Sequence, residues 1–447
     1  MARLVGIICV GVLTAAAAGA EEVAVTVYNS NLGVVSEVRD LSFVTGTGEV
    51  AFRDVPDQID PASVRFELVG SRQGISILEQ NYAYDLVSVD KIYSRYVDYD
   101  IEVLDKQGNL IGGTLLAAGQ GAITLRDASG RVKVVLLENV TQVNFPTLPE
   151  GLITRPTLFW RYAAETGGSF PARVSYQTYG LSWEAEYVGV LSADEKTLDL
   201  SGWASITNNT SKTFADATLK LVAGDISRAP QAKAAGMARM DMLATAEAGF
   251  EEKAFFEYHL YTLPRPSTVA GKEVKQISLF EPARTAAEKR FVYRPEQNAQ
   301  QVEVALQVVN AEQAGLGMPL PEGRVRVFQA DADGSLILLG EDRINHTPRD
   351  EKIDIRVGYA FDIVPEEKLM NQTRVSQQVE ERAYELQLRN RKDEPVTVHV
   401  EKALPGDWQV IAADFRYERK DARTLTFDVP VPARDTTTLN YTVRVKW

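Results

Sequence analysis

Residues 175–191 read SYQTYGLSWEAEYVGVL, and their alternation of apolar and polar side chains decides how this chain is interpreted. Successive side chains of a β-strand point to opposite faces of the sheet. A strand here gathers its apolar set on one face and its polar set on the other: Leu181, Trp183, Ala185, Tyr187 and Leu191 against Ser182, Glu184 and Glu186. We therefore expect the rings to be buried against a facing sheet and the acidic side chains to lie in solvent.

The two acids of this stretch, Glu184 and Glu186, also have the spacing of a glycoside-hydrolase pair. Carboxylates two residues apart on a strand lie about 6 to 7 Å apart, which sugar cleavage tolerates. Such a pair works by flanking the scissile bond, with burial raising the pKa of one acid. Neighbouring carboxylates on a wet face would both stay ionised, so we expect no catalysis here. Stacking of Trp183 and Tyr187 on a carbohydrate stays open as an alternative to core burial.

The same alternation recurs along most of the 447 residues. Clusters of turn-forming residues interrupt it about every eight to twelve residues, which is typical of all-β proteins. One local pattern, an apolar residue, any residue and then Asn at the end of a strand, recurs at Asn208, Asn310 and Asn390. Its spacing suits sandwich domains. We therefore predict several sandwich-like (Ig-like) modules, at residues 150–263, 264–365 and 366–447.

The N-terminal part is predicted to hold two further β units. Residues 21–92 form an N-terminal β domain, in which Leu41 to Phe52 resembles a hairpin turning at residues 45–48. Residues 93–146 hold five short strands separated by polar turns, which is typical of a small SH3-like or Sm-like barrel. Prolines 146 and 149 end that unit, because they favour an extended linker. Since the unit is acidic and expected to be exported, we interpret it as a spacer or protein-contact module.

The first twenty residues have the features of a secretory signal peptide: Arg3, an apolar run from Leu4 to Leu13, and small residues up to Ala20. That run is shorter than the roughly 20 residues that a membrane-spanning helix needs, and no later segment comes closer. We expect cleavage after Ala20 and a periplasmic or secreted protein without an integral membrane segment. Cys9 is the only cysteine, so we expect neither disulfides nor thiol chemistry in the mature chain.

The formal net charge of the chain is -13. An acidic surface repels phosphate backbones, and no basic run with interleaved aromatic residues stands out. We therefore expect no nucleic-acid partner. The sequence leaves the oligomeric state open.

Residues 231–250 interrupt the strand pattern as an insertion rich in Ala and Met. Met237, Met240, Leu243 and Ala244 would share one face of a helix. A membrane-contacting or partner-binding helix is one interpretation. We favour a short surface helix or an insertion between strands, because the face is narrow and carries few basic residues.

Residues that could carry catalysis or bind a metal occur without the spacing that such sites need. His259, His346 and His399 lie far apart and form neither HxH nor HExxH. Nucleophile-elbow, P-loop and dinucleotide-binding patterns do not occur. Residues 331–335, DADGS, begin like a calcium loop, but Asp-Gly between two alternating strands predicts a hairpin turn. We predict no catalytic residues, no metal ligands and no cofactor.

Two other segments allow a binding or a membrane interpretation. Trp160 and Tyr162 either seal the joint between the N-terminal part and the sandwich modules, which we favour, or contact a sugar or peptide. Residues 439–447 alternate up to a final Trp447, as the last strand of an outer-membrane barrel does. Pro430 and Pro432 lie just upstream and strand lengths are irregular, which favours a last sandwich strand.

Several motifs that follow one another in order resemble one known family. They are Val174-Ser-Tyr176, Leu181-Ser-Trp-Glu-Ala-Glu-Tyr187, Ile206-Thr-Asn208, Asp216-Ala-Thr-Leu219, Tyr258-His-Leu-Tyr-Thr-Leu-Pro264, Gly358-Tyr-Ala-Phe-Asp362 and Tyr441-Thr-Val-Arg444. With them the chain resembles, over residues 150–447 and more weakly over 25–85, the bacterial family of domain of unknown function 4139. Some of its members are called mucoidy inhibitor A. The resemblance implies exported β-rich proteins without an established activity and supplies no catalytic residues. Longer members carry a coiled coil, and the lack of a long heptad segment here weakens the link to exopolysaccharide control.

Three hypotheses about function follow. The first, which we prefer, is a non-enzymatic envelope protein whose modules contact another envelope protein or a cell-wall polymer. The second is a carbohydrate-binding or glycoside-hydrolase-like protein, which three or more aromatic side chains in a flat open stripe would favour. The third is an outer-membrane β barrel.

Overall fold

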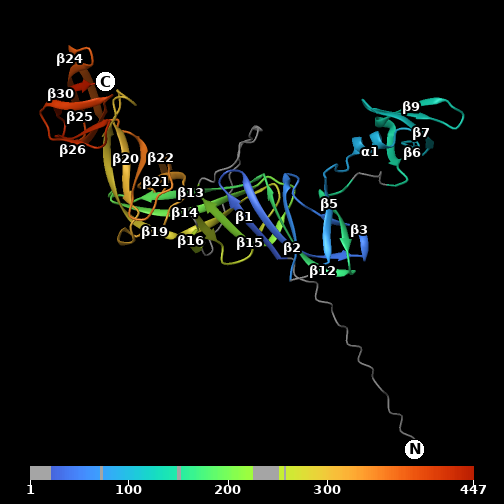
Figure 1. Ribbon diagram of the computed structural model, residues 1–447. Helices are drawn as coiled ribbons and strands as arrows, with labels where there is room; N and C mark the ends of the chain where they lie inside the picture. The colour runs from blue at the N-terminus through green and yellow to red at the C-terminus, as the bar shows by residue number, and fades with distance from the viewer. Residues whose placement is uncertain (1–21, 71–73, 148–152, 225–250, 256–257, 447) are drawn as a thin grey trace, which may run out of the picture.

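The computed structural model describes residues 22–70, 74–147, 153–224, 251–255 and 258–446 (Figure 1). The expected signal peptide, with Cys9 and the cleavage site after Ala20, lies outside the described residues, and so does the insertion at 231–250. The described residues form five β-sheets with one short α-helix and two single-turn 3-10 helices. The predicted all-β class is confirmed.

The first sheet has eight strands and joins the beginning of the chain to its middle. Its strands are β1 (Glu22–Tyr28), β2 (Leu32–Phe43), β4 (Ile59–Leu68), β12 (Gly168–Thr178), β15 (Phe214–Ala223), β16 (Glu251–Phe255), β17 (Tyr258–Thr262) and β18 (Ser267–Val269). β1 pairs antiparallel with β2 on one side and parallel with β15 on the other. The N-terminal strands are therefore built into the same sheet as strands far along the chain.

The second sheet has three strands in the order β3 (Gly46–Arg53), β11 (Thr157–Ala164) and β5 (Ile75–Ala83). Although β2 and β3 are consecutive, β2 pairs with β1 and β12, whereas β3 pairs with β11. The hairpin predicted for Leu41 to Phe52 is therefore wrong. The chain turns a corner between two sheets there, because the Val44 N–H donates to the Tyr162 hydroxyl at 2.8 Å and Gly46 adopts a φ of +96°.

The third sheet has ten strands and contains the stretch 181–191. Its strands are β13 (Leu181–Leu191), β14 (Thr197–Asn208), β19 (Glu273–Tyr293), β20 (Glu303–Val309), β21 (Gly323–Ala330), β22 (Leu336–Ile344), β23 (Lys352–Tyr359), β26 (Val396–Ala403), β28 (Tyr417–Arg419) and β29 (Thr424–Val431). The first part of β19 pairs with β14, and its last part pairs with β20 and, in parallel, with β26. This single long strand connects the middle of the molecule to its C-terminal part. The 3-10 helix η2 (Glu312–Ala314) follows β20.

The fourth sheet forms a C-terminal sandwich with β26 and β29. Its strands lie in the order β24 (Ile363–Ser376), β25 (Val379–Asn390), β30 (Thr436–Lys446) and β27 (Asp407–Ala413). Tyr441 and Val443 of β30 are buried in one core with Val400 of β26 and Phe427 of β29. The last described segment of the chain is therefore an interior strand that faces a second sheet.

The fifth sheet is a separate unit that we call the inserted module, residues 86–147. It contains α1 (Val89–Arg95), β6 (Asp100–Asp105), β7 (Leu110–Gly119), β8 (Ala122–Arg126), β9 (Val132–Leu136), η1 (Leu137–Asn139) and β10 (Val140–Asn144). The five predicted strands are present in the order β10-β6-β7-β8-β9, and no ladder between β9 and β10 closes them within the described part of the chain. The module has its own hydrophobic core, which includes Tyr96, Val103 and Leu115.

The recurring Asn pattern marks three turns of similar construction. Asn208 and Asn390 end β14 and β25, Asn310 follows β20, and all three side chains are fully buried. Asn310 Nδ2 donates to Met318 O at 2.7 Å, and its Oδ1 accepts the Gly317 N–H at 3.1 Å. The side chain thus closes the loop that contains η2, since its amide satisfies backbone groups that water cannot reach.

The molecule is elongated, with the inserted module at one end and the C-terminal sandwich at the other (Figure 1). The boundaries drawn from the sequence stay predictions, and ladders such as β1 with β15 and β14 with β19 run across several of them. In the part of the chain that is described, no helix is both long and apolar enough to cross a lipid bilayer.

Candidate functional site

The rings of β13 are buried, as the alternation in residues 181–191 predicts. Trp183 Nε1 donates to Val222 O in β15 at 2.9 Å, and the Tyr187 hydroxyl donates to Pro321 O at 2.8 Å. Burial raises the pKa of Tyr187 well above its ordinary value. Both rings are enclosed by protein, with their polar atoms satisfied, so stacking on a carbohydrate is not available to them.

The acids of β13 point away from the rings, but Glu186 is only 8% exposed. Its carboxylate lies 3.3 Å from Arg326 Nη1 and 4.0 Å from Arg324 Nε on the neighbouring strand β21, and both arginines also contact Glu341. The expectation that Glu186 lies in solvent is therefore wrong. Its cover comes from β21, a parallel partner that the sequence of β13 does not identify. Rings and acids share no cleft on β13, so a glycosidase arrangement is not formed there.

Trp160 and Tyr162 of β11 lie between the three-stranded and the eight-stranded sheet. Trp160 Nε1 donates to Gln80 Oε1 at 2.8 Å, and its ring centroid lies 5.2 Å from that of Phe66 in β4. The Tyr162 ring meets Phe43 of β2 edge-on, with 4.9 Å between centroids. Both rings join the two sheets and are buried, so neither offers a surface to a sugar or a peptide.

The three histidines lie on separate elements. His259 belongs to β17, His346 follows β22 and His399 belongs to β26. His346 Nδ1 accepts the Glu322 N–H at 3.0 Å, and His399 Nδ1 lies 2.6 Å from Asp428 Oδ1. Among the described residues, no three side chains of the metal-ligating types come together.

Residues 331–335 form the predicted turn between β21 and β22. Gly334 adopts a φ of +85°, and its N–H donates to Asp331 O at 2.9 Å. Asp333 Oδ1 accepts hydrogen bonds from both the N–H and the hydroxyl of Ser335, at 2.8 and 2.6 Å. The carboxylate thus closes the turn itself, which confirms the hairpin interpretation.

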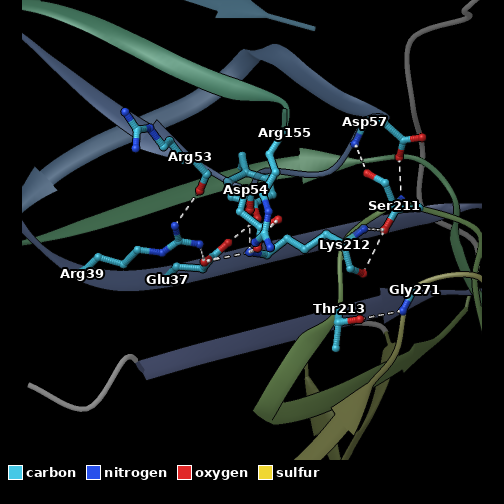
Figure 2. A network of polar contacts seen from close by, with 12 residues as sticks. Glu37, Arg39, Arg53, Asp54, Asp57, Arg155, Ser211, Lys212, Thr213 and Gly271 are labelled. Atoms are coloured by element: carbon cyan, nitrogen blue, oxygen red, sulfur yellow. Dashed lines mark hydrogen bonds and ion pairs between the residues drawn. The ribbon is translucent and has the colours of Figure 1, made fainter. Parts of the chain in front are cut away.

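A buried polar cluster, which we call the Glu37 cluster, lies where β2, the end of β3 and residues 211–213 meet (Figure 2). Glu37 is 1% and Lys212 5% exposed. Lys212 Nζ lies 3.4 Å from Glu37 Oε2, donates to Asp54 O at 2.6 Å and lies 3.6 Å from Asp54 Oδ2. Arg39 also binds Glu37 and donates to Arg53 O at 2.7 Å. The charges are therefore paired inside the protein.

Tyr176 of β12 completes the Glu37 cluster by donating its hydroxyl to Glu37 Oε1. Burial, reinforced by the Glu37 charge, raises the pKa of Tyr176 well above its ordinary value. Since one oxygen of Glu37 is bound by Tyr176 and the other by Arg39 and Lys212, the carboxylate holds three segments together. The sequence analysis did not identify this cluster, although its alternation held a signal. Glu37 and Arg39 lie two residues apart on the core face of β2, in line with Val35 and Leu41, so charged side chains occupy positions expected to be apolar.

A second buried cluster ties the two sheets of the C-terminal sandwich. Lys402 Nζ on β26 lies 2.7 Å from Glu367 Oε2 on β24 and 2.9 Å from Glu296 Oε1. The same ammonium lies 4.4 Å from the ring centroid of Tyr384, and the Tyr441 hydroxyl donates to Glu367 Oε1 at 2.7 Å. Burial, together with the charge of Glu367, raises the pKa of Tyr441 well above its ordinary value. The charged groups of this cluster therefore join strands of the two facing sheets.

A groove of about 770 Å³ opens on the inserted module. Two cross-strand rows line it: Asn144, Glu102 and Gly112 of β10, β6 and β7, then Asp100, Thr114 and Arg126 of β6, β7 and β8. Because Ile101 and Val103 of β6 are buried in the module core, the alternate residues Asp100 and Glu102 face outward. The groove therefore lies on the solvent face of the sheet.

The charges of this groove are only partly used within the protein. Asp100 Oδ1 accepts the Thr114 hydroxyl at 2.8 Å. Asp127 Oδ1 accepts the Ser129 hydroxyl at 2.6 Å and the Arg131 N–H at 3.0 Å, and its other oxygen lies 3.3 Å from Lys133 Nζ. The hydrogen bond from the Ser129 hydroxyl, followed by that from the Arg131 N–H, lowers the pKa of Asp127 to about 2. Within the described residues, Glu102 has no cationic partner and Arg126 no anionic one. The sequence indicated a protein-contact module here but did not identify these side chains.

The comparison with known families agrees with the motifs found in the sequence. A family model described as domain of unknown function (DUF4139) matches residues 172–447, which is more than half of the chain. The match begins within β12 and extends to the C-terminal sandwich, while the inserted module lies outside it. No curated protein matches the chain. By its sequence from β12 onward, this chain belongs to the DUF4139 family.

Proposed function

We propose that this chain is a non-enzymatic binding protein of the bacterial cell envelope, exported by its N-terminal signal peptide. Its partner would be another envelope protein or a cell-wall polymer. The observation that carries the proposal is the inserted module, a unit with its own core and an open groove, set into a hairpin of the main body.

The module interrupts two strands that are direct neighbours. β5 and β11 pair antiparallel, and Ala83 and Thr157 are register partners although the whole module separates them in sequence. At its base the Val87 N–H donates to Ile153 O at 2.9 Å, and the Ile153 N–H donates to Asp85 O at 3.2 Å. Insertions at such loop positions add recognition surfaces while leaving the scaffold intact. This placement favours a displayed binding unit over a structural part of the core.

The charged clusters of the main body support the same interpretation. The carboxylates of Glu37, Glu186 and Glu367 each bind cationic side chains between strands or sheets. They are used to hold the scaffold that carries the module.

The exposed aromatic side chains favour this function over carbohydrate binding. The most exposed ones are Tyr84, Tyr99 and Phe361. Tyr84 follows β5, Tyr99 precedes β6 and Phe361 lies between β23 and β24. Tyr84 stacks with Tyr82 and Tyr99 meets Tyr96 edge-on, and within the described part of the chain none of the three exposed rings packs against another of them. A sugar-binding platform requires several rings side by side.

Affinity capture from envelope extracts tests the proposal. The mature full-length chain is compared with a matched variant in which a short glycine-serine linker replaces residues 87–152, since the hydrogen bonds of Ile153 with Asp85 and Val87 place the two ends of the module together. We expect the full chain to recover a protein or a glycan that the variant does not. Recovery of the chain alone would contradict the proposal. Osmotic shock of the producing cells checks the location, because release of the processed chain is expected of a periplasmic protein.

A further inference from the structure

We propose that the groove of the inserted module binds an extended segment of a partner protein that carries lysine or arginine side chains. The inference rests on the proposed binding function and specifies which surface acts and what chemistry it recognises. The shape of the groove, its uncompensated charge and its apolar wall carry the argument.

The groove is open at Gly112, because glycine has no side chain to fill its floor. Gly112 lies beside Glu102 on the outer face, and a Cβ at Gly112 would meet no atom within 4 Å. A larger residue there would fill the floor between β6 and β8. The volume of about 770 Å³ lies within the range of ligand-binding pockets, about 300–1,000 Å³, and exceeds what a single ion occupies. The groove therefore suits a chain segment.

The charge of the groove selects a cation. Asp100 and Glu102 are two residues apart on β6, so their carboxylates lie side by side on one face, and like charges in such positions disfavour each other. No lysine or arginine among the described residues forms a hydrogen bond or an ion pair with either one. A partner ammonium or guanidinium between them would relieve this repulsion and add charge-assisted hydrogen bonds. Arg126, across Thr114 from Asp100, gives the groove one positive end and hence a preferred ligand direction.

Phe145 and Pro146 form an apolar wall next to these carboxylates. The Phe145 ring is held in place by Tyr93 and Tyr96, with centroid separations of 5.5 and 5.0 Å. Lysine and arginine cover such surfaces with their aliphatic stems while the charged ends stay hydrated or paired. Carboxylates next to a fixed apolar wall thus match the two parts of a basic side chain.

Fluorescence anisotropy with the mature full-length chain tests this inference. The probe is a short labelled peptide of alternating lysine and threonine, compared with the same peptide carrying glutamate in place of lysine and with a soluble cell-wall fragment as competitor. We expect binding of the lysine peptide alone, and weakening by added salt, since exposed charges are screened.

Three variants locate the binding surface. Asp100→Asn with Glu102→Gln removes the negative charge of both carboxylates and is expected to weaken binding by about tenfold. Gly112→Leu keeps the charge but fills the floor, and should weaken binding at least as much. Glu138→Gln, which removes one charge from exposed η1 outside the groove, is the control and should leave binding unchanged. Thermal unfolding of each variant confirms that the module remains folded.

Equal affinity of the lysine peptide for the wild type and for Gly112→Leu would overturn the groove assignment. Competition by the cell-wall fragment, or binding of the glutamate peptide, would overturn the basic-segment chemistry. Repeating the envelope capture with Gly112→Leu separates the two proposals. If this variant still recovers the partner that the linker variant loses, the binding function stands and the groove inference fails.

Discussion

The side chains of Asn208 and Asn390 make equivalent hydrogen bonds in two turns far apart in the chain. Asn208 Nδ2 donates to Lys212 O at 2.9 Å and Asn390 Nδ2 to Glu394 O at 2.8 Å, four residues onward in each case. Each Oδ1 accepts the N–H two residues onward, at 3.0 Å in the first turn and 2.9 Å in the second. Each amide also reaches a second segment, at Val269 O and Pro432 O. One amide side chain therefore closes a turn and attaches it to a neighbouring segment.

Replacing either asparagine should destabilise the fold around its turn strongly. Asn208→Ala leaves several buried backbone groups without partners, and each costs about 1–3 kcal/mol. We expect the free energy of unfolding, measured with urea, to fall by about 3 kcal/mol. Asn209→Ala is the matched control, because Asn209 is the exposed next residue. Equal effects of the two substitutions would show that the buried amide is not what stabilises the turn.

The buried cluster of Lys402, Glu367 and Glu296 should contribute far more to stability than an exposed ion pair does. Lys402→Met removes the cation between Glu367 and Glu296 and leaves two carboxylates close to each other with no counter-charge. Breaking a buried pair in this way costs about 3–5 kcal/mol, whereas exposed pairs contribute about 0–1 kcal/mol. Arg434→Ala, which breaks the exposed pair with Asp393, is the comparison, and urea unfolding measures both. A loss below about 1 kcal/mol for Lys402→Met would contradict a stabilising role for the cluster.

Gly323 should be intolerant of a single added carbon. It is paired with Ala185 across the parallel ladder between β13 and β21, and a Cβ would lie 2.1 Å from the Ala185 carbonyl oxygen. Because that oxygen belongs to the backbone, the strands must separate, and overpacking of this kind costs about 1–3 kcal/mol. Gly112→Ala serves as the control, since its Cβ meets nothing, and should change stability by less than about 0.5 kcal/mol. Thermal unfolding distinguishes the two.

The alternation of apolar and polar residues predicts features that a single strand determines. It does not predict features that depend on which strand pairs with it. It placed Trp183 and Tyr187 in a core, because burial of rings requires only that a facing sheet exists. It placed Glu186 in solvent wrongly, because its cover comes from Arg324 and Arg326, which only the parallel pairing of β13 with β21 brings near. The same limit explains the wrong hairpin prediction for Leu41 to Phe52. The alternation identified both strands, but it could not show that they belong to different sheets.

The groove could not be predicted from the sequence for a related reason. Asp100, Glu102 and Gly112 become neighbours through the register of β6 with β7, and a hollow is visible only after that register is known. The Asn pattern was predictable in contrast, since each turn is local and uses the same offsets along the chain.

His399 and Glu401 should stabilise the fold most between pH 4.5 and 6.5 and lose that stabilisation at higher and at lower pH. His399 Nε2 lies 3.5 Å from Glu401 Oε1, and Asp428 holds Nδ1. The hydrogen bond to Glu401, followed by that to Asp428, raises the pKa of His399 above its ordinary 6.5, although burial and nearby Arg290 oppose the shift. The hydrogen bond from His399, then those from Lys420 and Arg294, lowers the pKa of Glu401 below its ordinary 4.5.

The two shifts define one pH window. A histidine with a raised pKa stabilises the fold fully below 6.5 and loses that contribution as the pH rises through its folded pKa. A glutamate with a lowered pKa stabilises the fold above 4.5 and loses that contribution as the pH falls through its folded pKa. The difference in unfolding free energy between wild type and His399→Gln should therefore be largest between these two values and shrink toward alkaline pH.

NMR titration of the ring protons measures the histidine directly, since the chain has only three histidines and His399→Gln assigns the signal. We expect a midpoint above 6.5 for His399 and a lower one in Glu401→Gln, because that substitution removes the carboxylate that favours the protonated ring. Asp428→Asn should lower the midpoint less, since Asp428 makes the smaller contribution and lies mostly in solvent. A midpoint at or below 6.5 in the wild type would mean that burial and Arg290 outweigh both carboxylates.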